Sequence, residues 1–208
     1  MEKIQSPQND VAAVVLAGGQ GRRIGGGKPL RLLGNERLVD RALAMARRLS
    51  TYVALSVGSD GRLEDCDVPQ IADPETDWGA LGGLAAGLDF ALLQGLDLVI
   101  TLPCDSPFLP DDLLSRLHDS LRSDQGAALP KCGEQLHVAC GLWRVGVRAL
   151  LIDYAQSGGR SLHGLAERVG FTPVEWNSGQ LDPFFNINTE QDLERAEAIL
   201  AEMRKILP

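Results

Sequence analysis

Residues 16–28 read LAGGQGRRIGGGK and follow an apolar run, VAAVVL, at residues 11–16. The run predicts a buried first strand, and glycines directly after a strand let main-chain N–H groups turn inward and approach a ligand closely. Successive inward N–H groups form an anion-binding concavity, to which Arg22, Arg23 and Lys28 add full positive charges. The stretch therefore predicts a polyphosphate cradle at the start of an α/β chain, with a flexible surface loop as the alternative.

Two common glycine-rich phosphate loops do not fit this stretch. The P-loop has a glycine five positions before its Gly-Lys pair and a Ser or Thr after the lysine, whereas Arg22 and Pro29 stand at those positions. The dinucleotide fingerprint G-x-G-x-x-G, started at Gly19, fails because Ile24 takes the place of its last glycine. The predicted cradle is therefore of another kind.

Composition limits the class of protein. The chain has 208 residues, enough to bury a substantial core, and a net charge of −8, which argues against a nucleic-acid partner. Residues 1–10 are polar and predict a flexible amino terminus rather than a signal peptide, and no apolar run is long enough for a membrane span. The four cysteines lack metal-ligand spacing and suit the reducing cytosol. We therefore predict a cytoplasmic protein with one domain over residues 11–208 and with no membrane partner.

Strand and helix patterns alternate along the first half of the chain. Apolar runs predict strands at residues 52–57, 68–72 and 96–102, and helical spacing predicts helices at 38–49 and 79–92. This alternation is typical of a Rossmann-like α/β fold with a mostly parallel central sheet and helices on both faces. Weaker patterns in the second half predict strands at 127–130, 139–143, 171–176 and 184–187, and helices that begin near 110, 145 and 189.

Asp105 follows the apolar run 96–102 within the sequence PCDSP. In an open parallel sheet, ligands bind beyond the carboxyl ends of the strands, so Asp105 is expected at the same edge as the glycine-rich loop. Mg²⁺ takes one or two carboxylates and completes its shell with phosphate oxygens and water. We therefore predict that Asp105 binds Mg²⁺, with a turn-capping role as the alternative. Cys104 is predicted to be a buried thiol rather than a nucleophile.

These segments resemble a known family. The LAGG segment, the RRIGG segment and Lys28 are similar to the signature loop of nucleotidyltransferases that act on small phosphorylated molecules. The LAGG form resembles the molybdenum cofactor guanylyltransferases of the MobA type, because cytidylyl and sugar-phosphate relatives more often carry Ala-Ala-Gly. PCDSP and the sequence NINT at residues 186–189 are similar to two further family motifs, P-C-D-x-P and N-x-N-T. The resemblance implies an enzyme that transfers GMP from GTP to the terminal phosphate of molybdopterin and releases pyrophosphate.

The resemblance also implies roles for individual residues. Arg22, Lys28 and Asp105 would be catalytic, and Asp105 and Asn188 would bind the magnesium ion, although Asn188-Thr189 also reads as a helix N-cap. The N1–H and N2–H₂ donors of guanine suit a carboxylate or backbone carbonyls, and the candidates are Asp73 and the carbonyls of the turn at residues 79–83. The chain departs from the family pattern at three positions, with Gly27 in place of an acid before the lysine, Ser56 in place of an asparagine and Ala80 in place of a proline. The implied nucleotide-binding set is Leu16, Ala17, Gly18, Gly19, Lys28, Ser56, Asp73, Gly82 and Asp105.

The acceptor side is predicted from the second half of the chain. Arg160 follows two glycines and is a candidate for an acceptor anion, with a solvent-facing arginine as the alternative. His137 is a second candidate, with a core hydrogen bond as the alternative, and the N-x-N-T resemblance adds Asn186. The implied partners are GTP, molybdopterin or the molybdenum cofactor, and, transiently, proteins of molybdopterin synthesis and molybdoenzyme maturation. Two alternatives stay open, the same chemistry with CTP or a sugar phosphate and a non-catalytic nucleotide-binding carrier.

Overall fold

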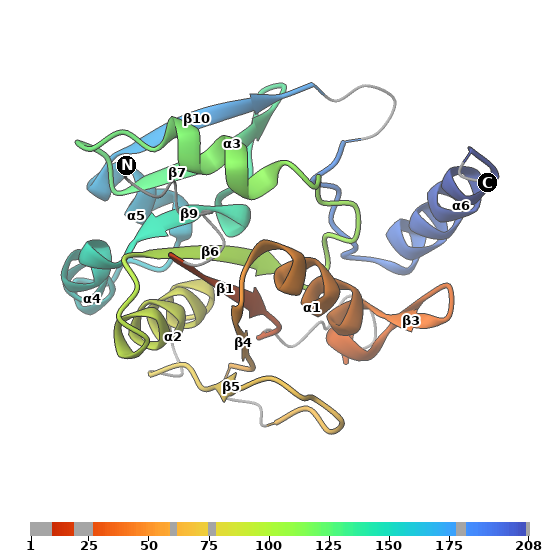
Figure 1. The fold of residues 1–208 in the computed structure, drawn as a ribbon, viewed down its shortest axis with the longest axis horizontal. Helices are drawn as coiled ribbons and strands as arrows, with labels where there is room; N and C mark the ends of the chain where they lie inside the picture. Colours follow the sequence, from red (N-terminus) through yellow and green to blue (C-terminus); the bar gives the residue numbers. More distant parts are fainter. Residues whose placement is uncertain (1–9, 19–26, 59–61, 75–77, 178–181, 207–208) are drawn as a thin grey trace, which may run out of the picture.

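An eight-stranded sheet forms the centre of the computed structural model, which describes residues 10–18, 27–58, 62–74, 78–177 and 182–206 (Figure 1). The strand order is β10-β7-β9-β6-β1-β4-β5, with β8 paired to β7. Within this sheet, all the described strands but β8 and β9 run in the same direction, so their carboxyl ends meet at one edge. The bounds are β1 Val11–Leu16, β4 Tyr52–Ser56, β5 Gln70–Ile71, β6 Leu98–Pro103, β7 Ala127–Cys132, β8 Gln135–Leu136, β9 Leu142–Arg144 and β10 Phe171–Trp176.

Helices cover both faces of the sheet. Val11, Ala13 and Val15 of β1 lie in one buried cluster with α1 (Leu38–Leu49) and α3 (Leu113–Ser120). The alternate residues of β1 lie in a second cluster with the helices α2 (Ala80–Leu93), α4 (Arg148–Gln156) and α5 (Leu162–Val169). A parallel strand that is buried on both faces reads as a continuous apolar run, which is the pattern at residues 11–16. The predicted α/β fold class is confirmed.

The last helix, α6 (Glu190–Ile206), lies beyond the carboxyl edge of the sheet, beside the hairpin of β2 (Leu32–Leu33) and β3 (Glu36–Arg37) (Figure 1). Its start is a capping box, because Thr189 N donates to Asp192 Oδ2 at 2.9 Å and Asp192 N donates to Thr189 Oγ1 at 3.1 Å. Gly34 N in the hairpin donates to Glu197 Oε1 at 2.6 Å. The first two bonds cap the start of α6, and the third connects the middle of the helix to the hairpin.

One strand prediction in the second half is wrong, and a second is right only in part. Residues 184–187 form no strand; Phe184 and Ile187 are buried from an irregular segment whose Ile187 N donates to Asp105 O at 2.9 Å. Residues 139–143 begin in a 3₁₀ turn, η4 (Val138–Cys140), and only the later part belongs to β9. An apolar run indicates that its residues are buried, but it does not show that they pair with a strand. Phe184 and Ile187 are buried by side-chain packing alone. The helix α5 was not predicted.

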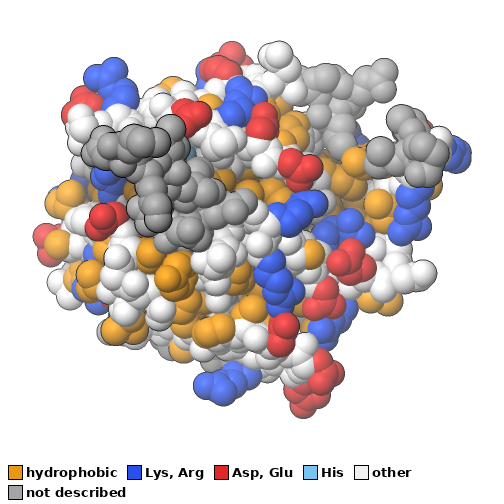
Figure 2. Space-filling view, in the orientation of Figure 1, with side chains coloured by type: hydrophobic (Ala, Val, Ile, Leu, Met, Phe, Trp, Pro, Cys, Tyr) orange, Lys and Arg blue, Asp and Glu red, His pale blue; other side chains and the backbone are white. Residues whose placement is uncertain are grey.

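Charged side chains cover α1 and the β2–β3 hairpin, where blue and red atoms alternate to the right of centre in Figure 2. Arg41 pairs with Glu36 at 2.9 Å, and Arg48 pairs with Asp111 at 2.9 Å. Exposed pairs of this kind contribute little to stability. Within the described part of the chain, no helix is both long and apolar enough to cross a membrane. The predicted flexible terminus, residues 1–10, lies outside the described residues except for Asp10.

Candidate active site

Backbone hydrogen bonds continue past the ends of β1, β4 and β6. Ala17 N donates to Ser56 O at 2.8 Å, and Cys104 N donates to Leu16 O at 3.1 Å. Just beyond, a Cβ added to Gly18 would lie 3.2 Å from the Cα of Gly58, and Gly58 has a left-handed φ of 66°. Side chains at these two positions would push the strand ends apart, so glycine is what allows the close approach.

Lys28, Asp105 and Asn188 meet at this edge, although 160 residues separate Lys28 from Asn188. Lys28 Nζ lies 2.5 Å from Asp105 Oδ2 and donates to Asn188 Oδ1 at 2.9 Å. The side chains of Lys28 and Asp105 are only 16% and 15% exposed. Their attraction is therefore stronger than that of a pair in open solvent. The structure brings together residues that come from three separate sequence motifs.

Asn186 holds the same carboxylate from its other oxygen. Asn186 Nδ2 donates to Asp105 Oδ1 at 3.1 Å and to Ser106 Oγ at 3.0 Å. Asp105 Oδ2 is thereby left to face Lys28. Cys104 precedes Asp105 in the sequence. Burial raises the pKa of its thiol to about 12, and the Asp105 charge contributes to this rise. The thiol is protonated at neutral pH, so Cys104 is not an activated nucleophile, and the predicted buried thiol is confirmed.

A second cluster forms where β4 ends and α2 begins. Ser56 Oγ donates to Asp73 Oδ1 at 3.0 Å, and a Cβ on Gly82 would lie only 2.7 Å from Asp73 Oδ2. A Cβ on the next residue, Gly83, would lie 3.0 Å from the side chain of Leu16. Burial raises the pKa of Asp73, and the bond from Ser56 offsets part of that rise. Four residues predicted to bind the nucleotide are therefore neighbours.

We expect Gly82→Ala to weaken nucleotide binding about tenfold, because the new methyl group would displace the Asp73 carboxylate. Overpacking of this kind also costs about 1–3 kcal/mol of stability. Nucleotide titration and thermal unfolding measure the two effects. Gly146→Ala is the matched control, since a Cβ there meets nothing within 4 Å. Nucleotide binding that equals the wild type in Gly82→Ala would contradict the role given to this contact.

We expect Asp73→Asn to raise the unfolding midpoint at pH 7 while it weakens nucleotide binding. Because burial raises the pKa of Asp73 in the folded state, its ionisation lowers stability as the pH rises from the unfolded pKa through the folded pKa. The cost is fully present above the folded pKa and absent below the ordinary aspartate pKa of about 3.9. Thermal scans from pH 4 to pH 8 should show the gain of the variant shrinking toward acid. A variant less stable than the wild type at pH 7 would contradict this account.

The remaining predicted residues differ in where they lie. Gly19 and Arg22 are outside the described residues. Arg160 is not the free side chain that its neighbouring glycines suggest, because its Nη1 donates to the carbonyls of Ala155 at 2.8 Å and Gly159 at 2.7 Å. A guanidinium group on such carbonyls stabilises the end of a helix, here α4. Nothing in these contacts connects Arg160 with an acceptor.

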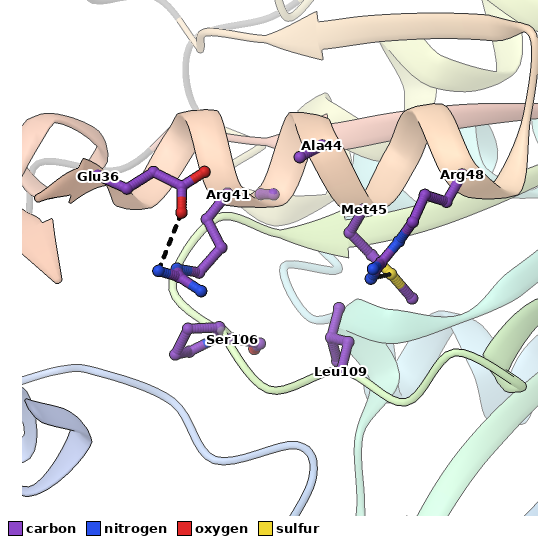
Figure 3. A pocket seen from close by; sticks show the side chains of 9 residues that line it. Glu36, Arg41, Ala44, Met45, Arg48, Ser106 and Leu109 are labelled. Carbon is purple, nitrogen blue, oxygen red and sulfur yellow. Dashed lines mark hydrogen bonds and ion pairs between the residues drawn. The ribbon is translucent and has the colours of Figure 1, made fainter. Parts of the chain in front are cut away.

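A pocket of about 190 Å³ lies behind the Asp105 segment, between α1 and residues 106–109 (Figure 3). On its α1 wall, Arg41 points toward Glu36, and Arg48 donates to Met45 Sδ at 3.0 Å (Figure 3). Ser106 belongs to the opposite wall, and its Oγ also accepts the bond from Asn186. The pocket therefore backs the segment that positions Asp105, and sequence patterns gave no sign of it.

Comparison with known proteins identifies the family. The model of the MobA-like NTP transferase domain matches residues 13–169. The chain belongs to this family. The molybdenum cofactor guanylyltransferase of Rhodopseudomonas palustris (strain HaA2) is 38% identical over 199 residues, which cover 90% of this chain and 91% of that protein. The protein of the same name from Nitrobacter hamburgensis is 35% identical over 195 residues, with 90% and 93% covered. The predicted resemblance and the enzyme class, a nucleotidyltransferase, are confirmed.

Solved structures share the fold of this transferase. Molybdopterin-guanine dinucleotide biosynthesis protein A from Archaeoglobus fulgidus superposes with a TM-score of 0.71 at 23% identity, covering 92% of this chain and 99% of that one. The 4-diphosphocytidyl-2C-methyl-D-erythritol synthase from Anaerococcus prevotii gives 0.70 at 17% identity, with 93% and 97% covered. A Mycobacterium tuberculosis protein solved in complex with manganese gives 0.62 at 16% identity, with 91% and 99% covered. Guanine and cytidine relatives fit equally well, so the fold does not select the base.

Proposed function

We propose that this nucleotidyltransferase transfers GMP from GTP to the terminal phosphate of molybdopterin, which forms the guanine dinucleotide cofactor and releases pyrophosphate. The observation that carries the proposal is the contact of Lys28 with Asp105 and Asn188 at the sheet edge. The names of the relatives that are 35% and 38% identical support the choice of nucleotide and acceptor. An oxygen of the acceptor phosphate bonds to the α-phosphorus of GTP, and the bond from that phosphorus to the bridging oxygen of pyrophosphate breaks.

The acceptor phosphate is already an anionic nucleophile, so the reaction needs no general base. Phosphoryl transfer then depends on alignment of the reacting groups and on neutralisation of their charge. The Lys28 ammonium group supplies positive charge next to Asp105, beyond the end of β6, and Asn186 fixes the orientation of the Asp105 carboxylate. Arg22, in the glycine-rich loop, would add a second cation toward the leaving pyrophosphate.

The residues of this cluster suit a magnesium ion. The Lys28 ammonium group contacts both a carboxylate oxygen of Asp105 and the amide oxygen of Asn188. It therefore occupies a position between two oxygen atoms of the kind that bind Mg²⁺. Among the described residues, no group of three or more His, Cys, Asp or Glu side chains could hold a metal ion. A magnesium ion at Asp105 and Asn188 would therefore take its remaining ligands from substrate phosphates and water. Asp105 and Asn188 would hold Mg²⁺, and when bound it neutralises charge on phosphate oxygens.

The Asp73 cluster would receive the base. Guanine offers two neighbouring N–H donors, and a carboxylate held by Ser56 can accept both. Cytosine and adenine lack this donor pair, so the preference for GTP rests on Asp73. The half-buried setting of the carboxylate increases the penalty for a base that leaves it without donors.

The test is pyrophosphate release with magnesium, compared for GTP, CTP and ATP with and without a molybdopterin-loaded donor protein. Release with GTP alone, dependent on the pterin, is the expected result. A preference for CTP would reassign the base pocket and retain the transferase chemistry. Tight GTP binding without any release would instead support a non-catalytic carrier.

A further inference from the structure

Three aromatic rings contact one another where β7 and β10 end, at the same sheet edge as Asp105. His137 follows β8, and its backbone N donates to Pro130 O at 2.8 Å. The His137 ring is stacked on Phe184 with centroids 4.7 Å apart, and Phe184 meets Trp176 edge-on at 5.4 Å. Since β7 and β10 run parallel to β6, these rings stand beside the reaction centre rather than behind it.

His137 carries an unsatisfied nitrogen. The residue is 7% exposed, and its Nε2 is buried without a hydrogen-bond partner in the described part of the chain. The nearest carboxylate, Asp182 Oδ2, is 3.9 Å away, which is too long for a hydrogen bond. Asp182 Oδ1 is already used, because it accepts from Phe184 N at 2.8 Å. Buried polar atoms are nearly always bonded, so this nitrogen calls for a partner that the described residues do not supply.

A short segment connects this pair with the reaction centre. Asp182 is four residues before Asn186, whose side chain donates to Asp105. The same segment also contacts the Asp105 backbone, because Ile187 N donates to Asp105 O at 2.9 Å. The acceptor phosphate must approach GTP near Asp105, so the remainder of the acceptor can extend toward His137 and Asp182.

We propose that His137 and Asp182 bind the heterocyclic ring of the acceptor, with the His137 Nε2 and the Asp182 carboxylate bonded to its polar edge. This inference rests on the proposed function. Pterin carries an amino group next to a ring N–H, a donor pair that suits a carboxylate. Burial lowers the pKa of His137, although Asp182 opposes the effect, so the imidazole is neutral and can bond an uncharged ring. His137 and Asp182 would together distinguish a pterin from other acceptors that carry a phosphate but no pterin ring.

The test compares His137→Phe with the wild type. Phenylalanine keeps the ring stacked on Phe184 and removes the unsatisfied nitrogen, so a structural role for His137 predicts normal kinetics and equal or greater thermal stability. The proposal predicts that KM for the pterin acceptor rises about tenfold or more, the worth of one lost hydrogen bond, with KM for GTP and kcat at saturating acceptor nearly unchanged. Asp182→Asn should also raise KM for the pterin acceptor. His137→Gln, which keeps a polar side chain, should raise it less than His137→Phe does. His163→Phe, at an exposed histidine on α5, is the control.

Direct binding of molybdopterin without GTP, followed by fluorescence under anaerobic conditions, separates this inference from the proposed function. If the wild type binds the pterin and His137→Phe binds it at least tenfold more weakly, the inference holds even when no GMP is transferred. If the wild type transfers GMP and His137→Phe binds the pterin within twofold of it, the inference is overturned and the proposed function stands. A wild type that neither binds the pterin nor transfers GMP overturns both.

Discussion

Replacement of Asp105 by asparagine is expected to reduce GMP transfer about a thousandfold while the protein stays folded. The substitution removes the only full negative charge in the described Lys28–Asp105–Asn188 contact set and leaves an amide of the same shape. Loss of one preorganised electrostatic contact typically lowers kcat by about 10²–10³, and here it would also remove the principal metal ligand. Steady-state pyrophosphate release measures the effect, and thermal unfolding shows whether the fold is intact.

The control for this experiment lies at the other end of the same strand. Asp97 is exposed just before β6 begins, so Asp97→Asn removes the same charge from the chain without touching the cluster. Its activity should stay within twofold of the wild type. Turnover of Asp105→Asn near the wild-type level would remove Asp105 from the proposed metal site and from the mechanism.

Lys28→Met should lower transfer about a hundredfold and, in the absence of nucleotide, strengthen the binding of a divalent metal about tenfold. The first effect follows from the loss of a cation that neutralises phosphate charge. The second follows because the ammonium group contacts the two oxygens that would ligate the metal and therefore competes with it. Titration with Mn²⁺, followed by electron paramagnetic resonance, measures metal binding independently of activity.

A lysine–carboxylate pair outside the site provides the comparison. Lys131 on β7 pairs with Glu175 at 3.0 Å, so Lys131→Met breaks a similar contact without freeing Asp105. It should leave both transfer and Mn²⁺ binding unchanged. Weaker metal binding in Lys28→Met would mean that the lysine supports the metal site rather than competing for it.

The parts of the fold that follow local patterns were predictable. The apolar runs at β1 and β6 and the helical spacing in α1 predicted a mostly parallel sheet, because a strand buried on both faces leaves a continuous signature. Phe184 and Ile187 gave a similar signature from an irregular segment, and the pattern cannot separate the two cases. Helix α5 was missed because it has only eight residues and begins at a lone serine cap, where Gly164 N donates to Ser161 Oγ at 3.1 Å.

The candidate site was predictable in part from the strand ends, which place Asp105 at the same edge as the glycine-rich loop, whereas Asn186 and Asn188 were predicted only through motif resemblance. Nothing in the spacing of the chain indicates that Lys28 bonds Asn188 or that Asn186 fixes the Asp105 carboxylate. Such contacts are set by how α6 and the sheet edge pack together, which is a property of the whole fold. The nearness of His137 and Asp182 is of the same kind, because it depends on how the segment after β10 returns across the strand ends.

The position of α6 has a consequence for the order in which the protein becomes active. Contacts that close a loop of 160 residues form late, since the entropy of the chain opposes them until the rest of the fold holds their ends together. During translation, the strands from β1 to β10 leave the ribosome before Asn186 and Asn188 do. A nascent chain can therefore bury its core and still lack one side of the Lys28 cluster. Catalytic competence therefore arises only when Asn186 and Asn188 join the cluster, so a chain that ends before them would be inactive rather than partly active.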